Sequence, residues 1–173
     1  MRTGTLPKPL KTEVMVFQCF AILGFGCIAY QDLRERLVYW ILFPLVGLFM
    51  ALAYLERSMT ISFIWNVVGN WILISLVLLL LWAYTKMRQR APFLNHSIGL
   101  GDILFFYAMA FGFPMVTFLV LFTGSLLFSL AIHLIANRKG TAATVPLAGY
   151  MSLFLIITFL ISYSSNHFEL YLI

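Results

Sequence analysis

Long apolar runs without a charged residue constrain this chain more than any other feature of its sequence. Residues 61–85 contain no Asp, Glu, Lys or Arg, and as one helix they would exceed the ~30 Å hydrocarbon core of a bilayer. Of the 173 residues, 62% are hydrophobic and 10% charged, whereas a soluble domain has about 25% charged residues. This balance excludes a water-soluble globule and a disordered chain. It predicts an all-α, polytopic membrane protein.

We expect a single transmembrane domain over residues 1–173, built as a bundle of six transmembrane helices. Residues 101–136 are too long for one span, and Gly112-Phe113-Pro114 is a turn signal that divides them. Pro44 is expected to kink the second helix. The expected spans are 14–31, 37–55, 61–85, 102–113, 115–136 and 144–163.

The distribution of basic residues favours six spans over five. With six spans, seven Lys and Arg residues flank one side of the membrane and four the other, whereas five spans give five and six. Because cytoplasmic loops carry the excess of Lys and Arg, both termini are expected outside. The net charge of +5 is explained by these loops, so we expect no nucleic-acid partner.

The chain contains two aspartates, Asp32 and Asp102, and both fall at predicted cytoplasmic helix ends. Asp32 closes the first span and Asp102 opens the fourth. Ionisable groups at membrane depth are costly and rare, which makes each a candidate functional residue. The plainer interpretations are that Asp32 is an interfacial charge balanced by Arg34 and Arg36, and that Asp102 is an N-cap. Their shared side of the membrane favours a functional pair.

Asp102 ends the tetrapeptide Gly99-Leu100-Gly101-Asp102. Gly99 and Gly101 are expected to support the site, because glycine adopts backbone angles that other residues avoid and lets another chain approach closely. The tetrapeptide resembles the G-x-G-D motif of type IV prepilin peptidases. Residues 30–38 resemble the Asp-x-x-x-x-x-Ile-Pro motif of that family, and residues 144–150 are similar to the Pro-containing start of its last helix. The resemblance covers about residues 14–163.

This resemblance implies an intramembrane aspartyl endopeptidase in the cytoplasmic membrane. Such an enzyme removes the short basic leader of prepilin-like proteins at the cytoplasmic face, and Asp32 and Asp102 correspond to its catalytic pair. The implied partners are a prepilin-like substrate and membrane lipids, and no metal or other cofactor is implied. The paired Cys-x-x-Cys insertion of the bifunctional members is absent from the sequence, which indicates the short form without methyltransferase activity.

The sequence departs from the family pattern beside both motifs. Tyr39 and Trp40 stand near the usual Pro-Asn, so the turn after Asp32 is expected to differ. Ile103-Leu104 replace the Val-Lys that often follows G-x-G-D.

Hydrolysis by two carboxylates requires that they share one proton, because two like charges about 3 Å apart do not both ionise readily. From the dipoles of their own helices, Asp102 at an N-terminus is expected to favour its anion and Asp32 at a C-terminus its acid form. Glu35 is a candidate contact for a Lys or Arg of the leader. A local pair between Glu35 and Arg34 or Arg36 is the plainer interpretation.

Two other functions stay open. In a small proton-coupled transporter, two membrane carboxylates would form a proton relay. In a non-catalytic subunit of a secretion system, they would be inherited from a peptidase. Presenilin-like proteases also use G-x-G-D, but Gln31 separates Tyr30 from Asp32, so their Tyr-Asp dipeptide is not reproduced.

Two pairs of small residues lie in the first apolar run. Cys19 and Cys27 do not form a Cys-x-x-Cys pair, so neither a zinc site nor a disulfide is expected. Gly24 and Gly26 are expected to allow close packing of a neighbouring helix.

Overall fold

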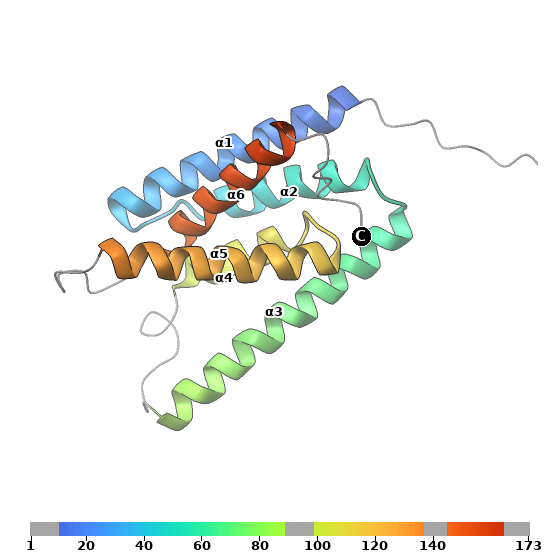
Figure 1. Cartoon of the computed structure of the whole chain (residues 1–173). Helices are drawn as coiled ribbons and strands as arrows, with labels where there is room; N and C mark the ends of the chain where they lie inside the picture. The colour runs from blue at the N-terminus through green and yellow to red at the C-terminus, as the bar shows by residue number, and fades with distance from the viewer. Residues whose placement is uncertain (1–10, 89–98, 137–144, 165–173) are drawn as a thin grey trace, which may run out of the picture.

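The computed structural model describes residues 11–88, 99–136 and 145–164, which form six helices and contain no strand. Successive helices run in opposite directions (Figure 1), so α1, α3 and α5 end at the side of the bundle where α2, α4 and α6 begin. The all-helical prediction is therefore confirmed. The helices are α1 (Lys11–Glu35), α2 (Leu42–Leu55), α3 (Thr60–Arg88), α4 (Leu100–Met109), α5 (Met115–Ala136) and α6 (Leu147–Ser164).

Four of these helices, α1, α3, α5 and α6, are long and apolar enough to cross a membrane. α2 and α4 are also apolar but have 14 and 10 residues. At ~1.5 Å per residue they are about 21 Å and 15 Å long, shorter than the ~30 Å core. Large apolar side chains such as Leu23, Trp65 and Val120 are exposed on the long helices, as expected for a surface in contact with lipid. The protein is thus an all-α membrane bundle.

The predicted division of residues 101–136 is confirmed, because α4 ends at Met109 and α5 begins at Met115. The predicted kink at Pro44 is wrong. α2 begins at Leu42 instead of residue 37, so Pro44 lies in the first helical turn. The N–H groups of the first turn have no partner within the helix, so the N–H that proline lacks is not needed there. Proline in the first turn therefore does not bend the helix.

Aromatic side chains from four helices fill the core of the bundle. The ring of Phe25 on α1 lies 6.0 Å from that of Phe105 on α4 and 6.4 Å from that of Phe159 on α6. Phe106 on α4 packs edge-on against Phe122 on α5, with ring centroids 5.0 Å apart. These contacts hold α1, α4, α5 and α6 together by burial and by favourable ring geometry.

Small residues bring α2 close to its neighbours. A Cβ at Gly47 would lie 3.4 Å from the Cα of Ala108 on α4, and a Cβ at Gly24 would overlap the side chain of Val46. The expectation of close packing is therefore confirmed at Gly24. It is wrong at Gly26, where a Cβ would meet nothing within 4 Å.

α3 packs least against the other helices, and its C-terminal half points away from them (Figure 1). Two asparagines attach its N-terminal half to the α4–α5 turn. Nδ2 of Asn70 donates to the carbonyl oxygens of Ala110 (3.0 Å) and Phe113 (2.9 Å), and Oδ1 of Asn66 accepts from the N–H of Met115 (2.9 Å). These bonds satisfy backbone groups that a helix end leaves without intrahelical partners.

Candidate functional site

Asp32 lies in the last turn of α1 and is buried, with 9% of its surface exposed. Its Oδ2 accepts a hydrogen bond from the N–H of Gly149 in the first turn of α6, at 2.6 Å. The first N–H groups of a helix have no partner within the helix. They also form the positive end of the helix dipole, so the start of α6 suits a carboxylate.

Asp102 lies in the first turn of α4 and is partly buried. Its Oδ1 accepts from the N–H of Ala148 at 3.1 Å, and its Oδ2 accepts from the N–H of Gly99 at 3.3 Å. Ala148 and Gly149 are adjacent in α6, so two successive amides hold the two aspartates. The structure therefore brings both predicted residues to one place, although they are far apart in the sequence.

The start of α6 is the part of this site that the sequence interpretation missed. In the sequence, residues 144–150 show only a similarity to the beginning of a helix. The signal was Pro146, which precedes the first helical residue, followed by Gly149. A Cβ at Gly149 would lie 3.1 Å from Oδ2 of Asp32 and 3.2 Å from Cγ of Leu33. The absence of a side chain there allows α1 to approach the amides of α6.

Burial changes the proton affinity of Asp102, which stands at the beginning of α4, outside the four long helices. Desolvation raises the pKa of Asp102 to about 6, and the nearby Asp32 carboxylate also raises it, while the bonds from Gly99 and Ala148 lower it. Burial therefore acts on Asp102 in the direction opposite to the dipole of its own helix, which was expected to favour the anion.

The two glycines of the G-x-G-D motif have different surroundings. A Cβ at Gly99 would lie 3.1 Å from Oδ2 of Asp102, tighter than ordinary contact. Gly99 therefore serves the site both through its N–H and through its missing side chain. A Cβ at Gly101 would lie 3.5 Å from the ring of Phe43, which is ordinary packing against α2.

The α1–α2 connection is fixed next to Asp32. Arg36 has a φ of 55°, a left-handed conformation that ends a helix, and its N–H bonds the carbonyl of Asp32 at 3.2 Å. Oε1 of Gln31 accepts from the N–H of Tyr39 at 3.0 Å. This loop explains why α2 begins later than expected.

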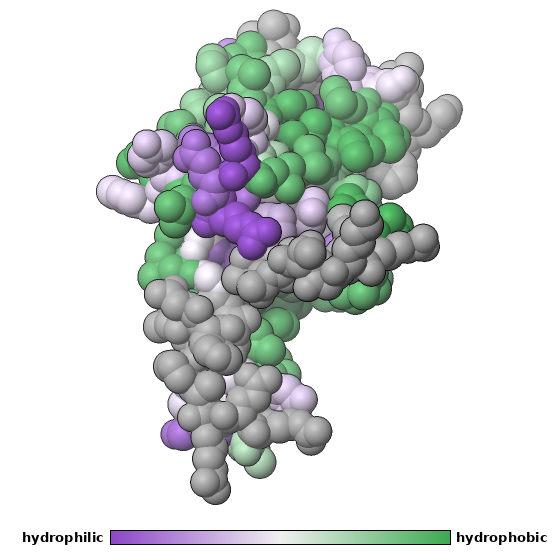
Figure 2. Space-filling model, turned by 90° about the vertical axis from the view of Figure 1, so that its left-hand side faces the viewer, coloured by the Kyte–Doolittle hydropathy of each residue, from purple (hydrophilic) through white to green (hydrophobic). Residues whose placement is uncertain are grey.

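The arginines next to Asp32 have different partners. Arg36 interacts electrostatically with Asp32, whereas Arg34 donates to the hydroxyl of Tyr30. Hydrophilic residues gather at this end of the bundle among apolar neighbours (Figure 2). Glu35, the candidate contact for a leader, is exposed here as the last residue of α1.

The site consists of two carboxylates and backbone donors. Within residues 11–88, 99–136 and 145–164, no group of three His, Cys, Asp or Glu side chains is placed to hold a metal ion. Comparisons of the chain with models of known protein families, with curated proteins and with solved structures gave no match.

Proposed function

We propose that this chain is an intramembrane aspartyl endopeptidase of the prepilin peptidase type, in which Asp32 and Asp102 act as one catalytic pair. The observation that carries this proposal is the binding of both aspartates of the chain by the adjacent amides of Ala148 and Gly149. Two carboxylates in one partly buried site at a helix end can share a proton.

In the proposed reaction, one carboxylate of the pair accepts a proton from a water molecule as its oxygen attacks the carbonyl carbon of the peptide bond. The other carboxyl group donates its proton to the carbonyl oxygen, which gives a tetrahedral diol. The diol then collapses as a proton passes to the leaving nitrogen. The amides of Ala148, Gly149 and Gly99 fix the carboxylates before substrate arrives, so little reorganisation is needed during the reaction.

The charge distribution supports a site at the cytoplasmic face of the cytoplasmic membrane. Arg34, Arg36 and Lys86 are exposed at the C-terminal ends of α1 and α3, on the side of the bundle where both aspartates lie, and cytoplasmic ends carry the excess of basic residues. Glu35 at this end provides a negative charge for a basic leader. The proposed substrate is a protein with a short basic leader followed by an apolar helix.

Cleavage in proteoliposomes tests the proposal. The chain is reconstituted with a prepilin-type substrate, and Asp32→Asn and Asp102→Asn are compared with Glu56→Gln, which removes a carboxylate at the opposite end of the bundle. We expect each aspartate substitution to reduce kcat by about 10³-fold or more and Glu56→Gln to cleave like the wild type. Cleavage retained by either aspartate variant would contradict the proposal. So would a wild type that does not cleave but takes up protons through both carboxylates, the result expected of a transporter.

A further inference from the structure

An apolar hollow of about 470 Å³ lies between α1 and α6. One side is formed by a stripe along α1, and α6 contributes one residue. Two members of the stripe, Gly26 and Cys27, are small. The lining residues are Ile22, Leu23, Gly26, Cys27, Tyr30, Gln31 and Ile156.

The hollow extends along α1 toward the site. Residues 22 to 31 cover about 13 Å of helix at ~1.5 Å per residue, and Gln31 directly precedes Asp32 in the sequence. The residues with polar groups, Tyr30 and Gln31, stand at the end nearest Asp32, and the remaining lining is apolar or a cysteine. The hollow is therefore apolar along most of its length and polar at the Tyr30–Gln31 end, which is the end nearer Asp32 along α1.

Gly26 leaves this hollow open. A Cβ built there would meet no atom within 4 Å, so the residue is not required for packing inside the chain. Small residues on a membrane helix let a second helix approach its backbone closely. The space above Gly26 and Cys27 is suited to such a helix.

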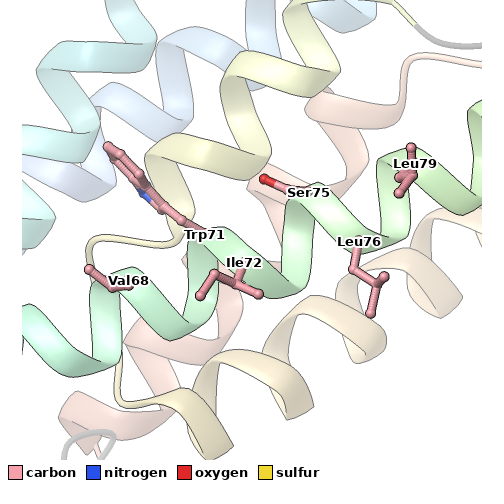
Figure 3. A pocket seen from close by; sticks show the side chains of 6 residues that line it. All are labelled: Val68, Trp71, Ile72, Ser75, Leu76 and Leu79. Carbon is pink, nitrogen blue, oxygen red and sulfur yellow. The ribbon is translucent and has the colours of Figure 1, made fainter.

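A second apolar hollow, of about 480 Å³, does not have this relation to the aspartates. All the residues that line it come from α3 (Figure 3), the helix that packs least against the others. Neither Asp32 nor Asp102 lies on α3 or next to its lining residues in the sequence.

Building on the proposed function, we propose that the hollow along α1 seats the apolar helix of the substrate. The bond to be cut must lie at Asp32 and Asp102, and the apolar helix that follows the leader must continue from there into the membrane. The hollow begins at Gln31, the residue before Asp32, and extends along α1 away from that end. Its polar-to-apolar order also matches a substrate in which a polar leader precedes an apolar helix.

Cross-linking through Cys27 tests this placement. Cys27 is five residues before Asp32, or about 7.5 Å along the helix. The Asp102→Asn variant, with Cys19→Ser to leave Cys27 alone, is mixed with prepilin-type substrates that carry a single cysteine at successive helix positions. We expect disulfide formation to be greatest about five residues after the cleavage site. The matched control is Cys27→Ser with Leu127→Cys, an exposed position at similar depth on α5.

Filling the hollow gives a second, kinetic test. Gly26→Trp is expected to lower kcat/KM about tenfold or more for the full substrate, and to leave cleavage of a leader peptide without the apolar helix unchanged. Equal cross-linking from Leu127→Cys, or wild-type cleavage of the full substrate by Gly26→Trp, would overturn the docking proposal. Such results would leave the catalytic pair intact, because that proposal is tested separately by Asp32→Asn and Asp102→Asn.

Discussion

Replacing Gly149 by alanine tests whether the start of α6 positions Asp32. The added Cβ would lie 3.1 Å from Oδ2 and 3.2 Å from Cβ of Asp32, so the carboxylate must move by a few tenths of an ångström and its 2.6 Å bond to the Gly149 N–H must weaken. A hydrogen bond to a charged group contributes about 1.5–3 kcal/mol. A loss at the lower end of this range, about 1.5 kcal/mol, corresponds to about a tenfold fall in kcat/KM. Initial rates of substrate cleavage in proteoliposomes measure this effect.

The stability of the same variant should change little. Alanine is favoured over glycine in a helix by about 1 kcal/mol, which opposes the cost of the new contact. Gly69→Ala is the matched control, because it makes the same chemical change in α3, where the added Cβ would meet only the end of the flexible Met115 side chain, at 3.3 Å. If Gly149→Ala cleaves like the wild type, or if Gly69→Ala loses as much activity, the positioning role of Gly149 is refuted.

The pKa of Asp102 is raised from 3.8 to about 6, so the folded protein binds the proton of this carboxyl more tightly than the unfolded chain does. The stabilisation by the protonated carboxyl is fully present below about pH 4 and is lost as pH rises through about 6. In Asp102→Asn, the unfolding temperature should change less between pH 4 and 8 than in the wild type. An unchanged pH dependence of the unfolding temperature would show that another group causes it. Asn70→Leu removes two buried hydrogen bonds to the α4–α5 turn and should lower the free energy of unfolding by about 2–4 kcal/mol, measured by denaturant titration; a change under about 1 kcal/mol would contradict this. Gly47→Val should separate α2 from α4 and lower the unfolding temperature, because its Cβ position is already 3.4 Å from the Ala108 backbone; an unchanged temperature would show that the two helices can adjust.

The helices were predictable because the signals that define them are local. Apolar runs predicted the helices, and the Gly112-Phe113-Pro114 turn correctly predicted the separation of α4 from α5. The error at Pro44 arose because apolar residues continue from the loop into α2. Their hydropathy does not show where the helix begins. The hydrogen bond from the Tyr39 N–H to Gln31 is a tertiary feature that this pattern cannot reveal.

The site was predictable to the extent that it consists of rare side chains. Asp32 and Asp102 stood out because they are the two aspartates of the chain. The amides of Ala148 and Gly149 were missed because a backbone donor has no side chain to mark it. The position of each aspartate in its own helix shows only the dipole of that helix, whereas the start of α6 binds both carboxylates. Gly26 was misjudged for a related reason, since the residues facing a glycine depend on how the helices are arranged.

A double-mutant cycle on the two aspartates tests the central claim most directly. Cleavage rates are measured for the wild type, Asp32→Asn, Asp102→Asn and the double variant in the same proteoliposomes. If the carboxylates act as one catalytic pair, removing either one abolishes their common function, and the double variant is no slower than the single variants. Losses that add in free energy, or substantial activity in either single variant, would show that the two aspartates do not act as a pair.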